Sequence, residues 1–465
     1  MVLQSINPTT EDVLDTFDEF SDAQVDQALQ QAHDAQLRWR ETSFGERAFR
    51  LQAAARVLRS QKNRWATLAT MEMGKPLVEA EAEIDKCAWN CDFYAEHAAS
   101  FLADEHIATE ARESFVAFEP LGVVLAIMPW NFPFWQVFRF AAPALMAGNG
   151  AVLKHASNVP RCALAIEEIF SSAGVPSGLF RTLLVPGSRV EPLIADARIQ
   201  AVTLTGSSTV GEQVASAAGR QIKKQVLELG GSDPFIVLAD ADLDGAVTTA
   251  VRARNQNNGQ SCIAAKRFIV EAPVADQFTE KFAAAVKALR VGDPMQRETN
   301  VGPLARQDLR DALEDQVERS VSSGAHTVVG GNPLDGKGYF YAPTVLDGVN
   351  ADMPAFREET FGPVAAVIRA RDPLDAVRLA NDTEYGLGSA LWTRDIERGK
   401  DLARRIEAGN VFINGMVASD PRLPFGGIKR SGYGRELGVF GIREFVNIQT
   451  IVVGQPSAPK SSPSE

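Results

Sequence analysis

The sequence lacks the features of a membrane or secreted protein. In its 465 residues the longest apolar run is GVVLAIMPW, at 122–130, far short of the ~20 apolar residues that cross a bilayer. The start, MVLQSINPTTEDVLDTF, has no basic segment followed by an apolar core, so no signal peptide is expected. Four cysteines without framework spacing favour a reducing compartment. We therefore expect a cytoplasmic protein with no membrane partner.

Basic stretches and metal-ligand clusters are also missing. With 47 Lys and Arg against 59 Asp and Glu, the net charge is −12 at pH 7. This balance argues against nucleic acid or an anionic membrane as the main partner. The five histidines are scattered singly, and no histidine or second cysteine pair accompanies Cys87 and Cys91. No metal site is expected.

The pattern of apolar residues predicts an α/β protein. From about Gly122, short apolar strands alternate with amphipathic helices, which is typical of βαβ units and a parallel sheet. The alternation begins again after Cys262, and the turn at 230–234 is the expected join between two α/β layers. Before these layers, helical periodicity covers residues 22–38, 45–71 and 77–103.

One cysteine stands apart from the other three. Cys262 follows NNGQS in a small, polar, glycine-containing turn, whereas core cysteines usually sit among aliphatic residues. It is either a packing residue or a nucleophile whose thiolate is exposed and activated. Glu228, in the apolar stretch QVLELGG, is likewise either an ion-paired residue or a general base whose pKa is raised by burial.

Two predicted strand ends could hold an anionic ligand. Residues 201–213, AVTLTGSSTVGEQ, lead from a strand through Gly206 and Ser207 into a helix, whose N-terminus suits a pyrophosphate. Neither a Walker A lysine nor a G-x-G-x-x-G pattern is present. The second strand end carries Lys154 and Ser157 and no acidic residue for ribose hydroxyls. These donors favour NADP over NAD.

An amide and a guanidinium lie among the aromatic residues of IMPWNFPFWQVFRF, at 127–140. A hydrophobic core explains the aromatic side chains, but Asn131 and Arg139 need partners if they are buried. The Asn131 side chain could stabilise an oxyanion, and Arg139 could pair with a carboxylate.

Together these segments resemble the aldehyde dehydrogenase superfamily over roughly residues 5–453. The resemblance rests on PWNFP, LTGSSTVG, ELGGSDP, GQSC, EETFGPV and PFGGIKRSGYGRE, in this order. It implies an α/β fold with a Rossmann-type cofactor domain, an α/β catalytic domain and a β-strand oligomerisation arm. The implied ranges are 1–106 and 125–229 for the dinucleotide-binding domain, 230–438 for the catalytic domain, 107–124 and 439–454 for the arm, and 455–465 for a disordered tail.

The resemblance also implies residue roles. Cys262 is the expected nucleophile, Glu228 the base that activates water, and Asn131 an oxyanion donor together with the backbone N–H of Cys262. A branch that transfers its acyl group to coenzyme A lacks this glutamate, so a free acid is the expected product. NADP is the expected cofactor, with NAD as the alternative. The implied cofactor contacts are Trp130, Asn131, Lys154, Ser157, Gly206, Ser207, Leu229, Glu359 and Phe361.

Within the superfamily, the chain most resembles dehydrogenases of succinate semialdehyde. These enzymes have an arginine eight residues after the asparagine, here Arg139, and a serine at Ser419, both for a distal carboxylate. Trp135 would wall the substrate pocket. Some relatives carry a second arginine six residues before the nucleophile, where this chain has Gln256. Glutarate semialdehyde and uncharged aldehydes are therefore alternative substrates.

A non-catalytic binding or structural protein on the same fold is the remaining alternative. The presence of Cys262, Glu228 and Asn131 disfavours it, because such a protein would be free to lose them. The strand-like segment REFVNIQTIVVG near the C-terminus could pair with a neighbouring subunit. We expect a homodimer or a homotetramer.

Overall fold

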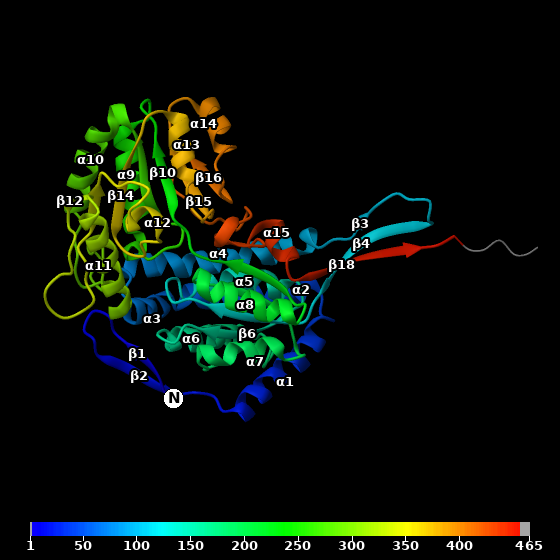
Figure 1. Ribbon diagram of the computed structural model, residues 1–465. Helices are drawn as coiled ribbons and strands as arrows, with labels where there is room; N and C mark the ends of the chain where they lie inside the picture. The colour runs from blue at the N-terminus through cyan, green and yellow to red at the C-terminus, as the bar shows by residue number, and fades with distance from the viewer. Residues whose placement is uncertain (1, 456–465) are drawn as a thin grey trace, which may run out of the picture.

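Two sheets with helices on both faces form the body of the protein, and a long arm extends from it (Figure 1). The computed structural model describes residues 2–455. Apart from residue 455, the predicted tail lies outside the described residues. No helix in the described part of the chain is long and apolar enough to cross a membrane.

Within residues 2–455, the first sheet has six strands in the order β17-β9-β8-β5-β6-β7, and β17 runs antiparallel to β9. Successive residues of the central strand alternate between two apolar cores: Val124 and Ala126 face one, Val123 and Leu125 the other. A continuous apolar strand is typical of a parallel sheet buried on both faces. The strands are β5 (Val123–Met128), β6 (Gly150–His155), β7 (Phe180–Thr182), β8 (Ile199–Thr205), β9 (Lys224–Glu228) and β17 (Gly432–Tyr433).

Helices from the first half of the chain cover this sheet. One face packs against α2 (Phe44–Ser60), α3 (Lys62–Met73), α4 (Leu77–Phe101), α5 (Trp135–Met146) and α6 (Pro160–Ser172). The other face packs against α1 (Asp22–Trp39), α7 (Val190–Ala195) and α8 (Ser208–Arg220).

The helix predicted over residues 45–71 is interrupted, which corrects that prediction. Helix α2 ends at Ser60 and α3 begins at Lys62, because Gln61 has a non-helical conformation with φ −116° and ψ 23°. Both helices contribute to the same apolar core, Leu58 from α2 and Trp65 from α3. The apolar periodicity therefore continues across the break, and the sequence pattern does not reveal it.

The second sheet, within the described residues, has seven strands in the order β12-β13-β14-β11-β10-β15-β16, with β12 antiparallel to β13. Helices α9 (Leu243–Asn255) and α10 (Ala272–Lys287) cover one face. On the other face lie α11 (Gln307–Ser322), α12 (Pro354–Arg357), α13 (Pro373–Asn381) and α14 (Ile396–Ala403). The strands are β10 (Asp233–Val237), β11 (Ala265–Glu271), β12 (His326–Val329), β13 (Thr344–Asp347), β14 (Val364–Ala370), β15 (Gly388–Trp392) and β16 (Asn410–Ile413).

The chain crosses from the first sheet to the second in the glycine-containing turn after Glu228. Strand β9 ends at Glu228, and β10 begins at Asp233 in the other sheet. Cys262 precedes β11, which pairs with β10. Glu228 therefore lies at the carboxyl end of β9 in the first sheet, and Cys262 lies before the amino end of β11 in the second sheet.

The arm in Figure 1 consists of strands from two distant parts of the chain. Strand β18 (Val446–Val453) pairs antiparallel with β4 (Glu113–Pro120), and β3 (Glu105–His106) pairs with the other edge of β4. The short helix α15 (Gly438–Arg443) precedes β18. The sequence reading missed one further element, an N-terminal hairpin of β1 (Val2–Ile6) and β2 (Val13–Asp18).

Candidate active site

Cys262 lies in a turn between α9 and β11 whose backbone is bent sharply. Asn257, Asn258 and Gly259, which precede it, have positive φ angles of 57°, 58° and 73°. Asparagine and glycine tolerate this left-handed conformation best among the amino acids. The side-chain amide of Asn257 also donates to the carbonyl oxygen of Asn131 at 2.9 Å. The polar NNG sequence thus supplies both the bend and an anchor.

Asn258 ties the same turn to two neighbouring loops. Its side-chain nitrogen donates to the carbonyl oxygens of Gly74 at 2.8 Å and Pro303 at 2.9 Å. The Gly302 N–H donates to its Oδ1 at 2.7 Å. We call residues 257–262, which carry the predicted nucleophile, the nucleophile turn. Because the hydrogen-bonding atoms of Asn258 are engaged inside the protein, this residue holds the turn without help from a ligand.

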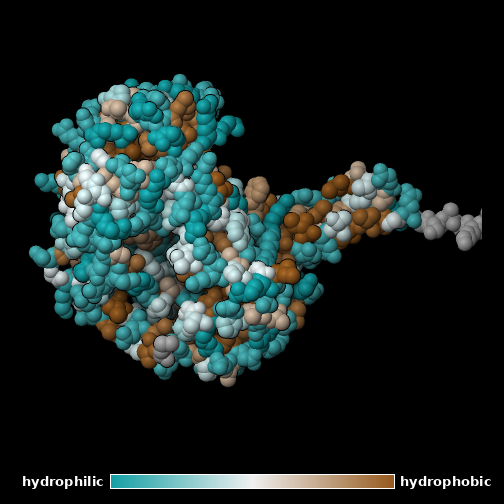
Figure 2. Space-filling view, in the orientation of Figure 1, coloured by the Kyte–Doolittle hydropathy of each residue, from teal (hydrophilic) through white to brown (hydrophobic). Residues whose placement is uncertain are grey.

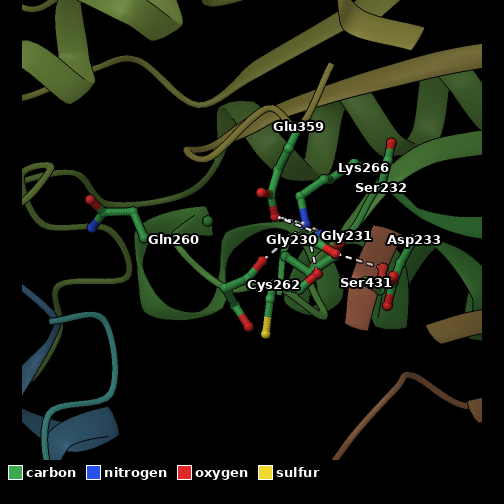
Figure 3. Close-up of polar contacts among 12 residues, drawn as sticks. Gly230, Gly231, Ser232, Asp233, Gln260, Cys262, Lys266, Glu359 and Ser431 are labelled. Carbon is green, nitrogen blue, oxygen red and sulfur yellow. Dashed lines mark hydrogen bonds and ion pairs between the residues drawn. The ribbon is translucent and has the colours of Figure 1, made fainter. Parts of the chain in front are cut away.

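Lys266 supports the nucleophile turn from the side opposite the sulfur of Cys262, as Figure 3 shows. Its buried ammonium donates to the carbonyl oxygens of Ser261 at 3.0 Å, Cys262 at 2.8 Å and Ala264 at 3.3 Å. The same ammonium lies 3.5 Å from Glu359 Oε1. The sulfur of Cys262 points away from this cluster. Lys266 therefore fixes the backbone and leaves the sulfur free to face the other side.

The surroundings of Cys262 favour the protonated form of its thiol. Burial raises the pKa of the thiol to about 12, while the positive charges of Arg139 and Lys266 act in the opposite direction. The thiol is therefore protonated at neutral pH. Any reaction that uses it as a nucleophile has to remove this proton first.

Asn131 follows β5 and reaches the same turn. Its side-chain N–H donates to the carbonyl oxygen of Gln260, two residues before the cysteine, at 3.1 Å. The segment after it is held by Glu83 on α4, which accepts the N–H groups of Phe134 and Trp135, each at 2.8 Å. A carboxylate at the start of α5 satisfies N–H groups that have no partner within the helix. Glu83 thereby sets the position of the predicted oxyanion donor.

Glu228 is buried beside a second carboxyl group. Its side-chain oxygens have no hydrogen-bond partner in the described residues. Burial, and next to it the charge of Glu436, raises the pKa of Glu228 well above its ordinary value, against the effect of Arg139. A raised pKa makes the ionised form of this carboxyl group a stronger base. Glu228 does not line the cavity that contains Cys262, so it must turn to act there.

A cavity of about 280 Å³ opens beside the nucleophile. Cys262 lies in its wall together with the three predicted substrate residues, Trp135, Arg139 and Ser419. The structure thus brings together side chains from α5, the nucleophile turn and the loop after β16. The cavity also contains Lys86 of α4, which the sequence reading did not single out.

Arg139 is already ion-paired in this cavity. Its guanidinium forms a buried salt bridge with Glu436, and the two side chains are only 2% and 3% exposed. A second nitrogen of Arg139 lies 3.3 Å from Thr205 Oγ1, and the guanidinium carbon lies 4.9 Å from the centre of the Phe425 ring. The positive charge of Arg139 is therefore largely matched within the protein.

The predicted cofactor residues lie at the carboxyl ends of strands in the first sheet. Gly206 and Ser207 connect β8 to α8, and the Ser207 hydroxyl caps this helix by accepting the Val210 N–H at 3.4 Å. Lys154 is half-buried near the end of β6, and no carboxylate in residues 2–455 lies within 4.0 Å of its ammonium. Ser157 follows it in the next turn. An unmatched positive charge at this edge suits an additional phosphate.

The remaining predicted cofactor residues lie between the two sheets. The rings of Trp130 and Phe361 are 5.8 Å apart and nearly perpendicular. Glu359 Oε1 accepts the Gly231 N–H at 3.0 Å, next to the nucleophile turn. Leu229 packs against α8 so closely that a Cβ on the helix residue Gly211 would lie 2.5 Å from its Cδ1.

Comparison with known proteins defines the class. The aldehyde dehydrogenase family model matches residues 1–451, and the chain belongs to this family. It is 55% identical, over 97% of its length and 99% of the relative, to a Synechocystis protein named "Probable succinate-semialdehyde dehydrogenase [NADP(+)]". A Mycobacterium avium protein named succinate-semialdehyde dehydrogenase [NADP(+)] is 52% identical, covering 98% of this chain and 97% of that protein.

A solved structure agrees with the fold. The succinic semialdehyde dehydrogenase of Streptococcus pyogenes, crystallised with NADP+ as the cofactor, superposes with a TM-score of 0.95 at 39% identity. The match covers 97% of this chain and all of that chain. The predicted α/β fold of the aldehyde dehydrogenase type is therefore confirmed.

Proposed function

We propose that this protein oxidises succinate semialdehyde to succinate with NADP+ as the hydride acceptor. The observation that carries the proposal is the cavity beside Cys262, whose lining includes the cationic side chains of Lys86 and Arg139 and the hydroxyl of Ser419. Succinate semialdehyde has an aldehyde at one end and a carboxylate at the other, which suits both ends of this cavity. The names of the two relatives at 52% and 55% identity support this choice.

In the proposed reaction, Cys262 loses its proton to solvent water, and its sulfur then forms a bond to the aldehyde carbon. The Asn131 side-chain N–H, with the backbone N–H of Cys262, stabilises the negative charge on the former aldehyde oxygen. Bound NADP+ would supply the hydride acceptor for this adduct, and Cys262 would then carry an acyl thioester. Glu228 takes a proton from water, whose oxygen attacks the thioester carbon and releases succinate and the thiolate.

Lys154 and Ser157 are the proposed reason why the cofactor site prefers NADP+ over NAD+. Ser207 and the α8 N-terminus would receive the pyrophosphate, and Lys154 with Ser157 would receive the ribose phosphate. Trp130, Leu229, Glu359 and Phe361 would line the rest of the site. Lys154→Ala is expected to raise KM for NADP+ about tenfold, which corresponds to roughly 1.4 kcal/mol, and to leave KM for NAD+ nearly unchanged. An equal rise for both cofactors would contradict this assignment.

The substrate proposal is tested with a panel of succinate semialdehyde, glutarate semialdehyde and butanal, each with NADP+ and NAD+. We expect the highest kcat/KM for succinate semialdehyde with NADP+. Butanal has the same four-carbon chain without the carboxylate, so it is the matched control. A kcat/KM for butanal equal to or above that for succinate semialdehyde would overturn the proposal in favour of a broader aldehyde dehydrogenase.

We also propose that the chain assembles into a homodimer or homotetramer through the arm of β3, β4 and β18. The predicted ranges 107–124 and 439–454 contain β4 and β18, but Val123 and Val124 belong to β5 of the first sheet. The exposed apolar side chains of Ile448 and Val452 on β18 support this proposal, and Figure 2 shows apolar surface along the arm. Light scattering of the native protein and of an Ile448→Asp variant tests it. A monomeric native protein would contradict it.

A further inference from the structure

One face of α4 contacts three segments at the cavity beside Cys262: the nucleophile turn, the start of α5 and the loop that carries Ser419. Glu79, Glu83 and Lys86 are spaced four and three residues apart, which places them on the same face of a helix. Glu79 accepts the backbone N–H of Asn257 in the nucleophile turn at 2.6 Å, and Glu83 holds the start of α5. Lys86, one turn further, donates to Ser419 Oγ at 2.7 Å.

The charges that surround Lys86 are all matched by other residues. Glu83 forms a buried ion pair with Lys75, and Arg139 forms one with Glu436.

The acid on the remaining side, Asp420, pairs with Arg422 at 2.6 Å. No carboxylate of the described chain lies within 4.0 Å of the Lys86 ammonium. A second basic residue at the cavity, Arg252, is exposed to solvent, where its attraction for an anion is screened. Among the basic side chains that line this cavity, Lys86 is therefore the half-buried one that has no carboxylate partner.

The geometry of the Lys86 ammonium leaves room for an anionic ligand. It lies 4.3 Å from the centre of the Trp135 ring, which also lines the cavity. An ammonium has three N–H donors, and one of them is given to Ser419. Both Lys86 and Ser419 line the same cavity as Cys262. A carboxylate at this end would meet an ammonium and a hydroxyl already held next to each other.

We propose that Lys86 is a specificity-determining residue, which binds the distal carboxylate of the substrate together with Ser419. Arg139, whose charge is matched by Glu436, would then contribute mainly by shaping the cavity and by its field at Cys262. Trp135 and Ser419 hold the Lys86 ammonium in place before the substrate arrives, so little side-chain freedom is lost on binding. This inference rests on the proposed oxidation of succinate semialdehyde.

The test compares kcat/KM for succinate semialdehyde and for butanal in Lys86→Met. We expect the ratio of the two values to fall about thirtyfold or more, the effect of removing one partner of a buried charge pair. The loss should fall on KM for succinate semialdehyde, while butanal is oxidised as before. Lys86→Arg should keep most of the ratio, because it keeps the charge. Isothermal titration with succinate, compared with butanoate, should show the same loss of affinity in Lys86→Met.

The matched control is Lys62→Met. Lys62 forms a surface ion pair at 3.0 Å with Asp85, the residue before Lys86 on α4, so its removal changes the net charge equally without touching the cavity. It should leave both aldehydes unaffected. If Lys86→Met lowers kcat/KM for both aldehydes by the same factor, or lowers it for neither, the inference about Lys86 is overturned. If the unmodified protein already shows no preference for succinate semialdehyde, the proposed function itself fails instead.

Discussion

The nucleophile turn and the carboxylate end of the cavity are built in different ways. The turn is held by side chains that bond to backbone atoms: Asn257, Asn258 and Lys266 together engage carbonyl oxygens from several loops. The carboxylate end is held by side chains that bond to each other, above all Lys86 with Ser419. We propose that the first arrangement fixes the position of the Cys262 sulfur, and that the second holds the Lys86 ammonium where it can bind a ligand carboxylate.

This difference explains why a mutation in each region should have a different signature. A change in the turn displaces the sulfur, and every aldehyde should suffer alike. A change at the carboxylate end alters an attraction that only some substrates have. Arg139 lies between the two regions, because its guanidinium faces the cavity, pairs with Glu436 and lowers the pKa of Cys262.

The largest effect is expected from Arg139→Met. Removing this guanidinium leaves the Glu436 carboxyl buried without its partner, which costs about 3 kcal/mol or more in unfolding free energy. The pKa of Cys262 should rise further, so both succinate semialdehyde and butanal should be oxidised more slowly. Urea denaturation and the pH dependence of Cys262 alkylation by iodoacetamide measure the two effects. Adding Glu436→Gln should restore much of the stability, and failure to do so would contradict the matched-pair description.

Asn258→Ala tests the turn with a somewhat smaller effect. The change leaves the carbonyl oxygens of Gly74 and Pro303 and the N–H of Gly302 without this partner. The free energy of unfolding should fall by about 2 kcal/mol. We expect kcat to fall by the same factor for succinate semialdehyde and butanal. Asn258→Gly keeps the left-handed conformation and so separates backbone strain from the lost hydrogen bonds. A fall in kcat for only one of the two aldehydes would contradict the distinction between the two regions.

The smallest effect concerns pH. Burial, together with the charge of Arg139, lowers the pKa of Lys86 to about 8, and the groups that oppose this shift are Cys87, Asp420 and Glu83. Below this pH the ammonium is charged and attracts a carboxylate, whereas above it the attraction is lost. The ratio of KM for succinate semialdehyde to KM for butanal should therefore rise by at most about tenfold per pH unit above pH 8.

The ratio of the two KM values cancels the titration of Cys262, which both aldehydes share. Lys86→Arg should give a flat ratio over the same range, because arginine stays protonated. A ratio that rises equally in Lys86→Arg would assign the pH dependence to another group.

Much of the fold could be predicted because its signals are local. Strands such as β5 are continuous apolar runs, and the polar setting of Cys262 contrasts with the three buried cysteines. The break at Gln61 could not be predicted, because the apolar periodicity continues across it. The hairpin before α1 could not be predicted either, because its strands are short and mostly exposed. The division of the chain into domains stays a prediction.

The site could be predicted in its motifs but not in its charge pairing. Glu436 and Arg139 are nearly 300 positions apart, a separation at which sequence spacing carries no information about contact. Lys86 is a single lysine on an amphipathic helix, where a solvated side chain is the ordinary reading. The available signal was the spacing of Glu79, Glu83 and Lys86 on one face of α4. Charged residues on a helix face that must also pack indicate buried partners.

The central claim is that Cys262 carries the acyl group until Glu228 activates the water that releases it. Glu228→Gln preserves the shape of the side chain and removes the base. On mixing this variant with NADP+ and succinate semialdehyde, we expect a burst of NADPH stoichiometric with the protein. Mass spectrometry of the intact chain should then show one succinyl group, which peptide mapping places on Cys262. A variant that turns over at the native rate, or an acyl group on Cys87, Cys91 or Cys162, would contradict the account.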